Sequence, residues 1–82
     1  MGELRIENPA TTDQFVALME AADVKLPLAL HDGDLGVVVD AEGRDVLTVD
    51  VNGGRPDEAV EQIAGWIVLA VNTCGGFRAE RA

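Results

Sequence analysis

The sequence predicts a small α+β domain, in which a small antiparallel sheet, made of a central β-hairpin plus one or two edge strands, packs against two helices. Two observations support this prediction. Residues 37–54 alternate apolar and polar side chains around a turn sequence, DAEGR, which is the pattern of a hairpin. Residues 12–22 and 56–74 repeat apolar side chains every three or four positions, as amphipathic helices do. With 82 residues and no linker-like segment, residues 1–82 are expected to form a single domain.

The first helix has a defined start. Thr11, followed three residues later by Gln14, matches a capping box, and Asp13 lies in the first turn, where the helix dipole favours an acid. We therefore expect a helix from about Thr12 to Ala22. Its apolar face would consist of Phe15, Leu18, Met19 and Ala22.

Two short segments are candidates for edge strands. Leu4 and Ile6 alternate with charged residues, which is the period of a half-buried strand. Pro27 excludes a helix from the segment around it, and leucines alternate there, so Leu28 to His31 are expected to form a second edge strand.

The central hairpin is specified by its turn. In DAEGR, Ala41 and Glu42 are expected at the centre of a type I turn and Gly43 in the left-handed position, so that Asp40 pairs with Arg44. Side chains then alternate between two faces. The face expected to join the core contains Leu35, Val37, Val39, Leu47 and Val49, with Asp45 at its rim. The opposite face is expected to be an acidic surface around a small apolar centre, formed by Asp34, Val38, Asp40, Val46 and Asp50.

The second helix is expected to begin at Pro56 and to stop at Gly75, residue types that are common at these two helix ends. Its expected apolar stripe consists of Ala59, Ile63, Trp66, Ile67, Ala70, Val71 and Cys74. Four further apolar residues lie outside that stripe: Val60, Ala64, Val68 and Leu69. Because one small sheet cannot cover so much apolar surface, we expect this helix to be sandwiched by the first helix or partly buried in a homodimer.

The charge indicates the kind of partner. Six basic residues against fifteen acidic ones give a formal net charge of −9. Such a chain would be repelled by nucleic acid and by anionic membranes and attracted to basic protein surfaces. Residues 32–61 contain nine of the acids and two of the bases, so the charge belongs to the hairpin and to the start of the second helix. We see no signal peptide and no membrane-spanning run, and we expect a cytoplasmic location.

Catalytic and metal chemistry find little support in the sequence. Cys74, the only cysteine, lies in an apolar helical stripe, where we expect a buried and inert thiol, and His31 is expected to be a loop residue. Asp50, Asn52 and Glu61 have part of the spacing of a calcium loop, but the intervening residues do not fit that motif. We therefore predict no enzyme activity, no metal and no cofactor.

The candidate binding site is the acidic face of the hairpin. Acids on a sheet edge can simply keep it soluble, or they can form a binding surface, and the sequence leaves both readings open. If the face binds a partner, the residues expected to do so are Asp34, Asp40, Glu42 and Asp50, with Asp45 at the rim and Val38 and Val46 as the apolar centre.

Two segments resemble a class of small phage and prophage proteins from proteobacteria, whose pattern is a D-x-x-G hairpin followed by a helix reading roughly A-N-A-x-x-I-V-x-A-V-N. Asp40 and Gly43 match the hairpin. The helix is matched by Ala64, Ile67, Val68, Ala70, Val71 and Asn72. The resemblance covers about residues 37–74, and its motifs are structural rather than catalytic.

Small acidic phage-associated α+β proteins also look like anti-CRISPR proteins. That resemblance implies an inhibitor, in the cytoplasm of a bacterial host, that binds a basic surface of a type I CRISPR surveillance complex and blocks target DNA, because an RNA-guided effector holds its target in a positively charged channel. The alternative is a small structural or regulatory dimer in which Val60, Val68 and Leu69 form the functional surface and the acids only increase solubility.

Overall fold

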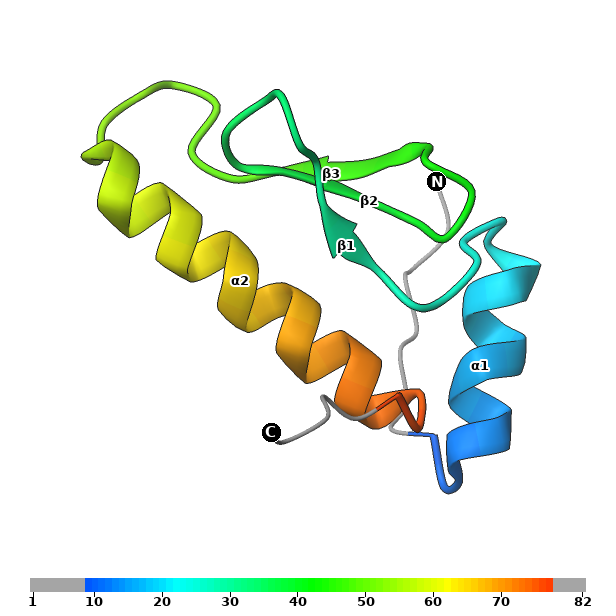
Figure 1. Cartoon of the computed structure of the whole chain (residues 1–82). Helices are drawn as coiled ribbons and strands as arrows, with labels where there is room; N and C mark the ends of the chain where they lie inside the picture. Colours follow the sequence, from blue (N-terminus) through cyan, green and yellow to red (C-terminus); the bar gives the residue numbers. More distant parts are fainter. Residues whose placement is uncertain (1–8, 78–82) are drawn as a thin grey trace, which may run out of the picture.

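A computed structural model describes residues 9–77 and confirms an α+β fold. The elements in chain order are α1 (Thr12–Ala21), β1 (Ala29–Leu30), β2 (Val37–Val39), β3 (Asp45–Thr48) and α2 (Asp57–Cys74) (Figure 1). The strands form one antiparallel sheet in the order β1-β2-β3. The edge strand predicted at Leu28 to His31 is therefore present, in a shorter form, whereas the one predicted around Leu4 and Ile6 lies outside the described residues.

Helix α1 begins as its sequence predicts. The Thr11 side chain accepts a hydrogen bond of 3.0 Å from the Gln14 N–H, and the Gln14 side chain accepts one of 2.6 Å from the Ala10 N–H. The two residues thus satisfy N–H groups that the helix itself leaves unpaired. The helix has no fully buried residue, and Leu18, expected on its apolar face, is 53% exposed.

The turn between β2 and β3 has the predicted geometry. The Asp40 N–H donates to the Arg44 carbonyl at 2.9 Å, and the Gly43 N–H donates to the Asp40 carbonyl at 2.9 Å. Gly43 has a φ of 84°, the left-handed conformation that favours glycine. The pairing of Asp40 with Arg44, and of Val39 with Asp45 beyond it, is therefore confirmed.

Beyond this turn the predicted register is wrong, because β3 contains a bulge. Val39 pairs with Asp45 but Val38 pairs with Leu47, so Val46 is an extra residue that opposes nothing in β2. A one-residue shift exchanges the two faces of a strand relative to its neighbour. Leu47 thus lies opposite Val38, and the face around Val38, predicted to be an outer surface, is part of the core. Val39, predicted for the core, is buried as well.

The core lies between that face of the sheet and α2. Val38 and Ala64 have no exposed surface, and they cluster with Leu26 and Leu28. Val60 and Ala64, expected outside the apolar stripe of α2, are its two buried residues. Several members of the predicted stripe point outward instead: Trp66 is 65% exposed, and Ala70 and Cys74 are exposed.

A glycine in the loop before β2 allows this packing. Gly36 has a φ of 82°, and a Cβ built on it would lie 2.8 Å from the Val60 side chain and 3.0 Å from the Val49 carbonyl. Only a residue without a side chain lets α2 approach the sheet so closely here. Leu35, expected in the core beside this glycine, is instead 47% exposed.

Helix α1 lies at one end of the molecule, between the hairpin turn and the C-terminal end of α2 (Figure 1). A Cβ on Gly76, just after α2, would lie 3.0 Å from the Thr12 side chain, which places the start of α1 against that end. The first helix therefore does not sandwich the second, and one face of α2 has no covering element within residues 9–77.

Candidate functional site

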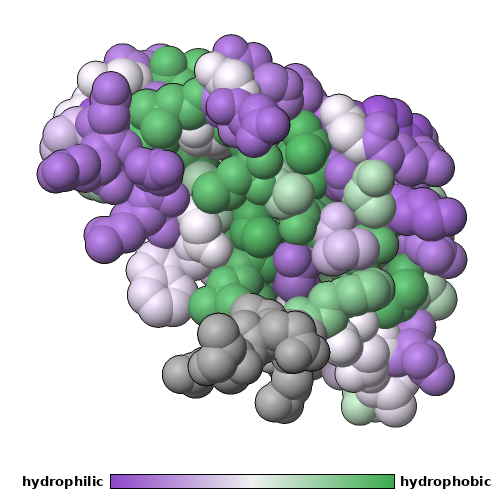
Figure 2. All heavy atoms as spheres, in the orientation of Figure 1, coloured by the Kyte–Doolittle hydropathy of each residue, from purple (hydrophilic) through white to green (hydrophobic). Residues whose placement is uncertain are grey.

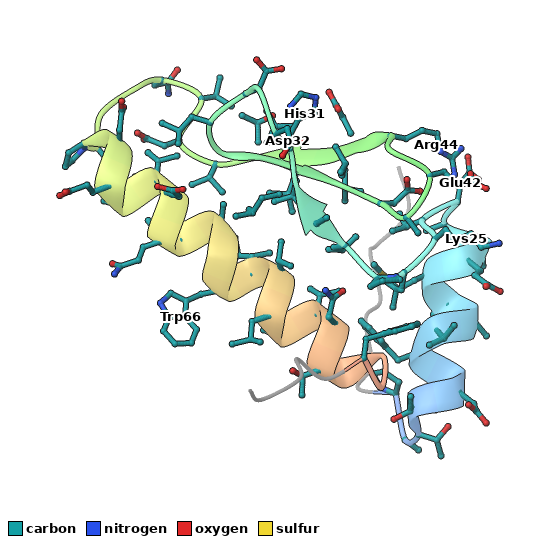
Figure 3. All side chains as sticks on the ribbon, in the orientation of Figure 1. Lys25, His31, Asp32, Glu42, Arg44 and Trp66 are labelled. Atoms are coloured by element: carbon teal, nitrogen blue, oxygen red, sulfur yellow. The ribbon has the colours of Figure 1, made fainter. Side chains whose placement is uncertain are left out.

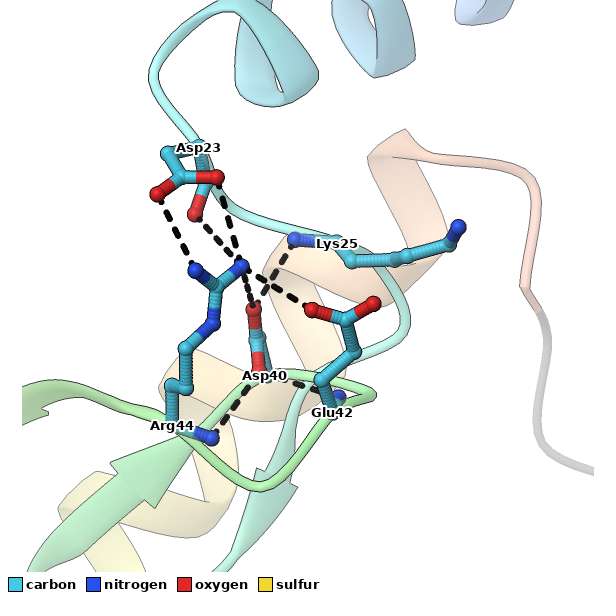
Figure 4. A network of polar contacts seen from close by, with 5 residues as sticks. All are labelled: Asp23, Lys25, Asp40, Glu42 and Arg44. Carbon is cyan, nitrogen blue, oxygen red and sulfur yellow. Dashed lines mark hydrogen bonds and ion pairs between the residues drawn. The ribbon is translucent and has the colours of Figure 1, made fainter.

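Asp40, the aspartate of the D-x-x-G turn, is a buried structural residue with 3% exposure. One carboxylate oxygen accepts hydrogen bonds from the N–H groups of Glu42 and Arg44, both at 3.0 Å. The other accepts from the Lys25 N–H and from the Arg44 guanidinium, both at 3.2 Å. Figure 4 shows that Arg44 also reaches Asp23, at 3.0 Å, after the end of α1. The carboxylate thus ties the hairpin turn to the segment that follows α1.

This arrangement stabilises the charged form of Asp40. Burial by itself would raise the pKa of the carboxyl group. The three backbone N–H donors, from Lys25, Arg44 and Glu42, together with the Arg44 guanidinium, outweigh burial and hold that pKa below its ordinary value. Asp40 is therefore a partner for groups within the chain and has little surface to offer to another molecule.

Asp50 has a similar internal role. It adopts a φ of 57°, and its side chain is 6% exposed. The carboxylate accepts hydrogen bonds from the N–H groups of Gly54 at 3.3 Å and Arg55 at 2.8 Å, and the Arg55 guanidinium lies 3.2 Å away. Asp50 thus organises the loop that leads into α2.

The predicted acidic face of the hairpin does not exist as one surface. Val38 is fully buried, Val46 is half-buried and packs against the core, and Asp40 and Asp50 are occupied internally. The three remaining residues of the predicted site are exposed: Asp34, Glu42 and Asp45. Glu42 lies 3.2 Å from Arg44 in an ion pair, which leaves Asp34 and Asp45 as carboxylates without an arginine or lysine partner in the part of the chain that the structure describes.

Asn72, near the end of α2, holds the edge strand in place. Its side-chain oxygen accepts a hydrogen bond of 2.6 Å from the Leu28 N–H, and its side-chain nitrogen donates one of 2.9 Å to the Leu28 carbonyl. The carboxamide pairs with this backbone as a neighbouring strand would. Asn72, like Asp40, belongs to the motifs that carry the sequence resemblance, and both have structural roles.

The other residues considered for catalysis or metal binding do not lie together at one site. The His31 Nδ1 accepts hydrogen bonds from the N–H groups of Gly33 and Asp34, both at 3.0 Å, so His31 organises its own loop as expected. Cys74 is exposed, which corrects the expectation of a buried thiol. Within residues 9–77, no group of three or more His, Cys, Asp or Glu side chains is placed to hold a metal ion. No helix in this part of the chain is long and apolar enough to cross a membrane.

A surface with several adjoining grooves lies along the uncovered face of α2. Three shallow grooves adjoin there: one runs along α2, one lies between α2 and the loop of residues 31–36, and one lies between α2 and β1. They share lining residues, since Glu61 lines the first two, Leu30 the last two, and Gly65 and Leu69 the first and third. We call this continuous region the α2–β1 surface and define it by Leu30, Asp34, Glu61, Gly65, Trp66 and Leu69.

The α2–β1 surface combines exposed apolar side chains with carboxylates. Trp66 is 65% exposed and points away from the sheet (Figure 3), and Leu69 and Leu30 are 41% and 40% exposed. In Figure 2, hydrophobic residues gather in a band across the middle of the molecule, with hydrophilic residues on both sides. Asp34 and Glu61 border one groove, and among residues 9–77 neither lysine nor arginine lines any of the three.

Of this surface, only Asp34 was predicted for the acidic binding site, and Leu69 was predicted for the contact of the alternative dimer. Trp66 was assigned to the apolar stripe of the second helix, which was expected to pack inward. The informative signal was the excess of apolar residues around α2, which indicated uncovered surface without showing which side faces solvent.

Comparisons with protein-family models, with curated proteins and with solved structures each found no match. The α2–β1 surface and the charge of the chain are therefore the features that bear on its function.

Proposed function

We propose that the chain is a protein-binding module that docks its α2–β1 surface onto a basic, partly apolar surface of another protein. The observation that supports this most is the combination of exposed Trp66, Leu69 and Leu30 with bordering carboxylates in one continuous region. Aromatic side chains at the centre of an interface supply much of its affinity, and surrounding polar groups provide specificity.

The ion pairs that the arginines form within the chain support a basic partner. Arg44 lies within ion-pair distance of Asp23, Asp40 and Glu42, and Arg55 pairs with Asp50. These contacts neutralise positive charge inside the chain, whereas several exposed acids have no such partner within residues 9–77: Asp13, Glu20, Asp32, Asp34, Asp45, Asp57, Glu58 and Glu61. The field outside the molecule is therefore negative, which accelerates encounter with a basic surface.

In its narrower form, the proposed function is that of an anti-CRISPR inhibitor. The module would occupy the basic DNA-binding surface of a type I surveillance complex and so exclude target DNA. The net charge of −9 and the resemblance to small phage-associated acidic proteins support this form. We assign the contact to α2 and the adjoining loop rather than to the hairpin, because Val38 is buried and Asp40 and Asp50 are bonded within the chain.

A DNA-binding assay with a purified type I surveillance complex tests the proposal. The wild-type chain should reduce target binding, and Asp34→Lys with Glu61→Lys should weaken that inhibition at least about tenfold, since both substitutions reverse charge at the proposed contact. The matched control, Glu20→Lys with Asp45→Lys, changes net charge equally, lies elsewhere and should inhibit like the wild type.

Two outcomes would contradict the proposal. Equal loss in both double variants would show that net charge matters and the α2–β1 surface does not. Absence of inhibition by the wild-type chain would rule out the anti-CRISPR form for the complex tested.

The rival function, a small structural or regulatory dimer, is favoured by one observation, the exposure of Trp66, Leu69 and Phe77 near one another on α2 and just after it. Val60 and Val68, the other residues expected at a dimer contact, are buried or packed against the core. Light scattering on the wild type and on Leu69→Asp, together with the inhibition assay on the wild type, separates the two functions. A wild-type dimer that Leu69→Asp dissociates, formed by a chain that does not inhibit the surveillance complex, would favour the rival.

A further inference from the structure

Gly65 is a glycine in the interior of α2 that the packing of the described residues does not require. A Cβ built on Gly65 would meet no atom of residues 9–77 within 4 Å, whereas one on Gly36 or Gly75 would lie 2.8 Å or 2.6 Å from a neighbouring side chain. Glycine weakens a helix interior relative to alanine, because it loses more conformational freedom on folding. The space left open at Gly65 therefore serves no contact within residues 9–77.

The position of Gly65 indicates what this space is for. Gly65 lines two of the three grooves, and in the sequence of α2 it directly precedes Trp66 and lies one helical turn before Leu69. Without a side chain there, the helix backbone is accessible beside two exposed apolar side chains. Helices approach one another more closely where the contacting side chains are small.

We infer that the partner contacts the α2–β1 surface with an amphipathic helix that crosses α2 at Gly65 and carries Lys or Arg beside its apolar stripe. This inference rests on the proposed function and specifies which secondary-structure element of the partner makes the contact. The apolar stripe of the crossing helix would contact Trp66 and Leu69 beside Gly65, while Glu58 and Glu61, which line the groove along α2, would face its cations.

Charge favours such a helix over a second copy of the chain. In an antiparallel pair of α2 helices centred on Gly65, Glu61 of each copy would lie beside Leu69 of the other. The carboxylates would lose water without gaining a cation, which is unfavourable. A basic helix offers the same apolar contact together with the missing positive charge.

Two synthetic helical peptides without tryptophan provide the test. Both carry the same leucine stripe, and the residues beside it are Lys in one peptide and Glu in the other. Trp66, the only tryptophan, reports binding through its emission. The Lys peptide should give a saturable, salt-sensitive blue shift, and the Glu peptide should give none.

Substitution at Gly65 then tests the crossing point. Gly65→Leu should weaken binding of the Lys peptide at least about tenfold, because the added side chain fills the open space. Ala70→Leu adds bulk to an exposed position of the same helix outside the grooves, and it should bind like the wild type. Gly65→Ala should raise the melting temperature while weakening binding, which separates the contact from folding.

Three results would overturn the inference. The first is unchanged affinity of Gly65→Leu for the Lys peptide, and the second is equal binding of both peptides. The third is a wild-type dimer that Gly65→Leu dissociates, which would assign this surface to a second copy. If Asp34→Lys with Glu61→Lys abolishes inhibition of the surveillance complex while Gly65→Leu leaves inhibition intact, the proposed function stands and this inference fails.

Discussion

Replacing Asn72 by alanine should cost a large part of the stability of the fold. The substitution removes both hydrogen bonds to Leu28, and it leaves a part-buried N–H and a part-buried carbonyl without partners. A hydrogen bond contributes about 1 kcal/mol net to stability, and a buried polar group left without a partner costs about 1–3 kcal/mol. The free energy of unfolding of Asn72→Ala should therefore be about 2–3 kcal/mol lower than that of the wild type. The total free energy of unfolding of a domain of this size is about 5 kcal/mol.

Urea unfolding monitored by far-UV circular dichroism measures this effect. With a slope of about 1 kcal/mol per molar urea, the midpoint should fall by about 2–3 M. Trp66 emission is a poor probe of unfolding, since its side chain is already 65% exposed in the folded chain. Thr73→Ala, at the exposed next position, should stay within about 0.5 kcal/mol of the wild type. A similarly small change in Asn72→Ala would refute the view that this side chain anchors β1.

Two further substitutions test the turn and the close approach of α2. Because the pKa of Asp40 is lowered on folding, its charge stabilises the fold above its ordinary value of 3.8, and this contribution is lost as the pH falls through the lower folded value. Asp40→Asn should therefore be less stable than the wild type at pH 7, and urea titrations at several pH values should show the gap narrowing below about pH 4. Asp45→Asn, which changes an exposed carboxylate, should stay within about 0.5 kcal/mol of the wild type at pH 7. Gly36→Ala should lower the free energy of unfolding by about 2 kcal/mol or more, because Gly36 has a positive φ and an added Cβ would collide with Val60. Gly53 also has a positive φ, of 72°, but lies beside open space, so Gly53→Ala should lose only the smaller part that comes from the backbone conformation. Equal losses in thermal melts of the two variants would show that the Val60 side chain moves aside.

Elements whose ends depend on local chemistry could be predicted from the sequence. Thr11 caps α1 through a contact three residues away, and Gly43 sets the hairpin turn through its own backbone conformation. Helix α2 ends at Cys74 through the same kind of short-range preference, because Gly76 adopts the left-handed conformation with a φ of 86°. In each case the deciding atoms lie within a few residues of one another, so the pattern contains the information.

The faces that become buried could not be predicted, because that choice depends on distant residues. Both faces of the hairpin carry valines, and the bulge at Val46 changes the register without any glycine or proline to mark it. Helix α2 is apolar around most of its circumference, and its orientation follows from Val60 packing against Gly36, a contact across the fold. The predicted binding site changed with these two choices, since Val38 turned inward and Trp66 turned outward.

Asp40 and Asn72 stabilise the fold through buried polar contacts, whereas other residues form the surface that is exposed to other molecules. Both side chains bond to backbone groups, so the identity of the neighbouring side chains matters little to these contacts. Positions such as Trp66 and Leu69 can then change during evolution at little cost to folding. A chain built this way can acquire a new partner by a few surface substitutions while its architecture stays the same.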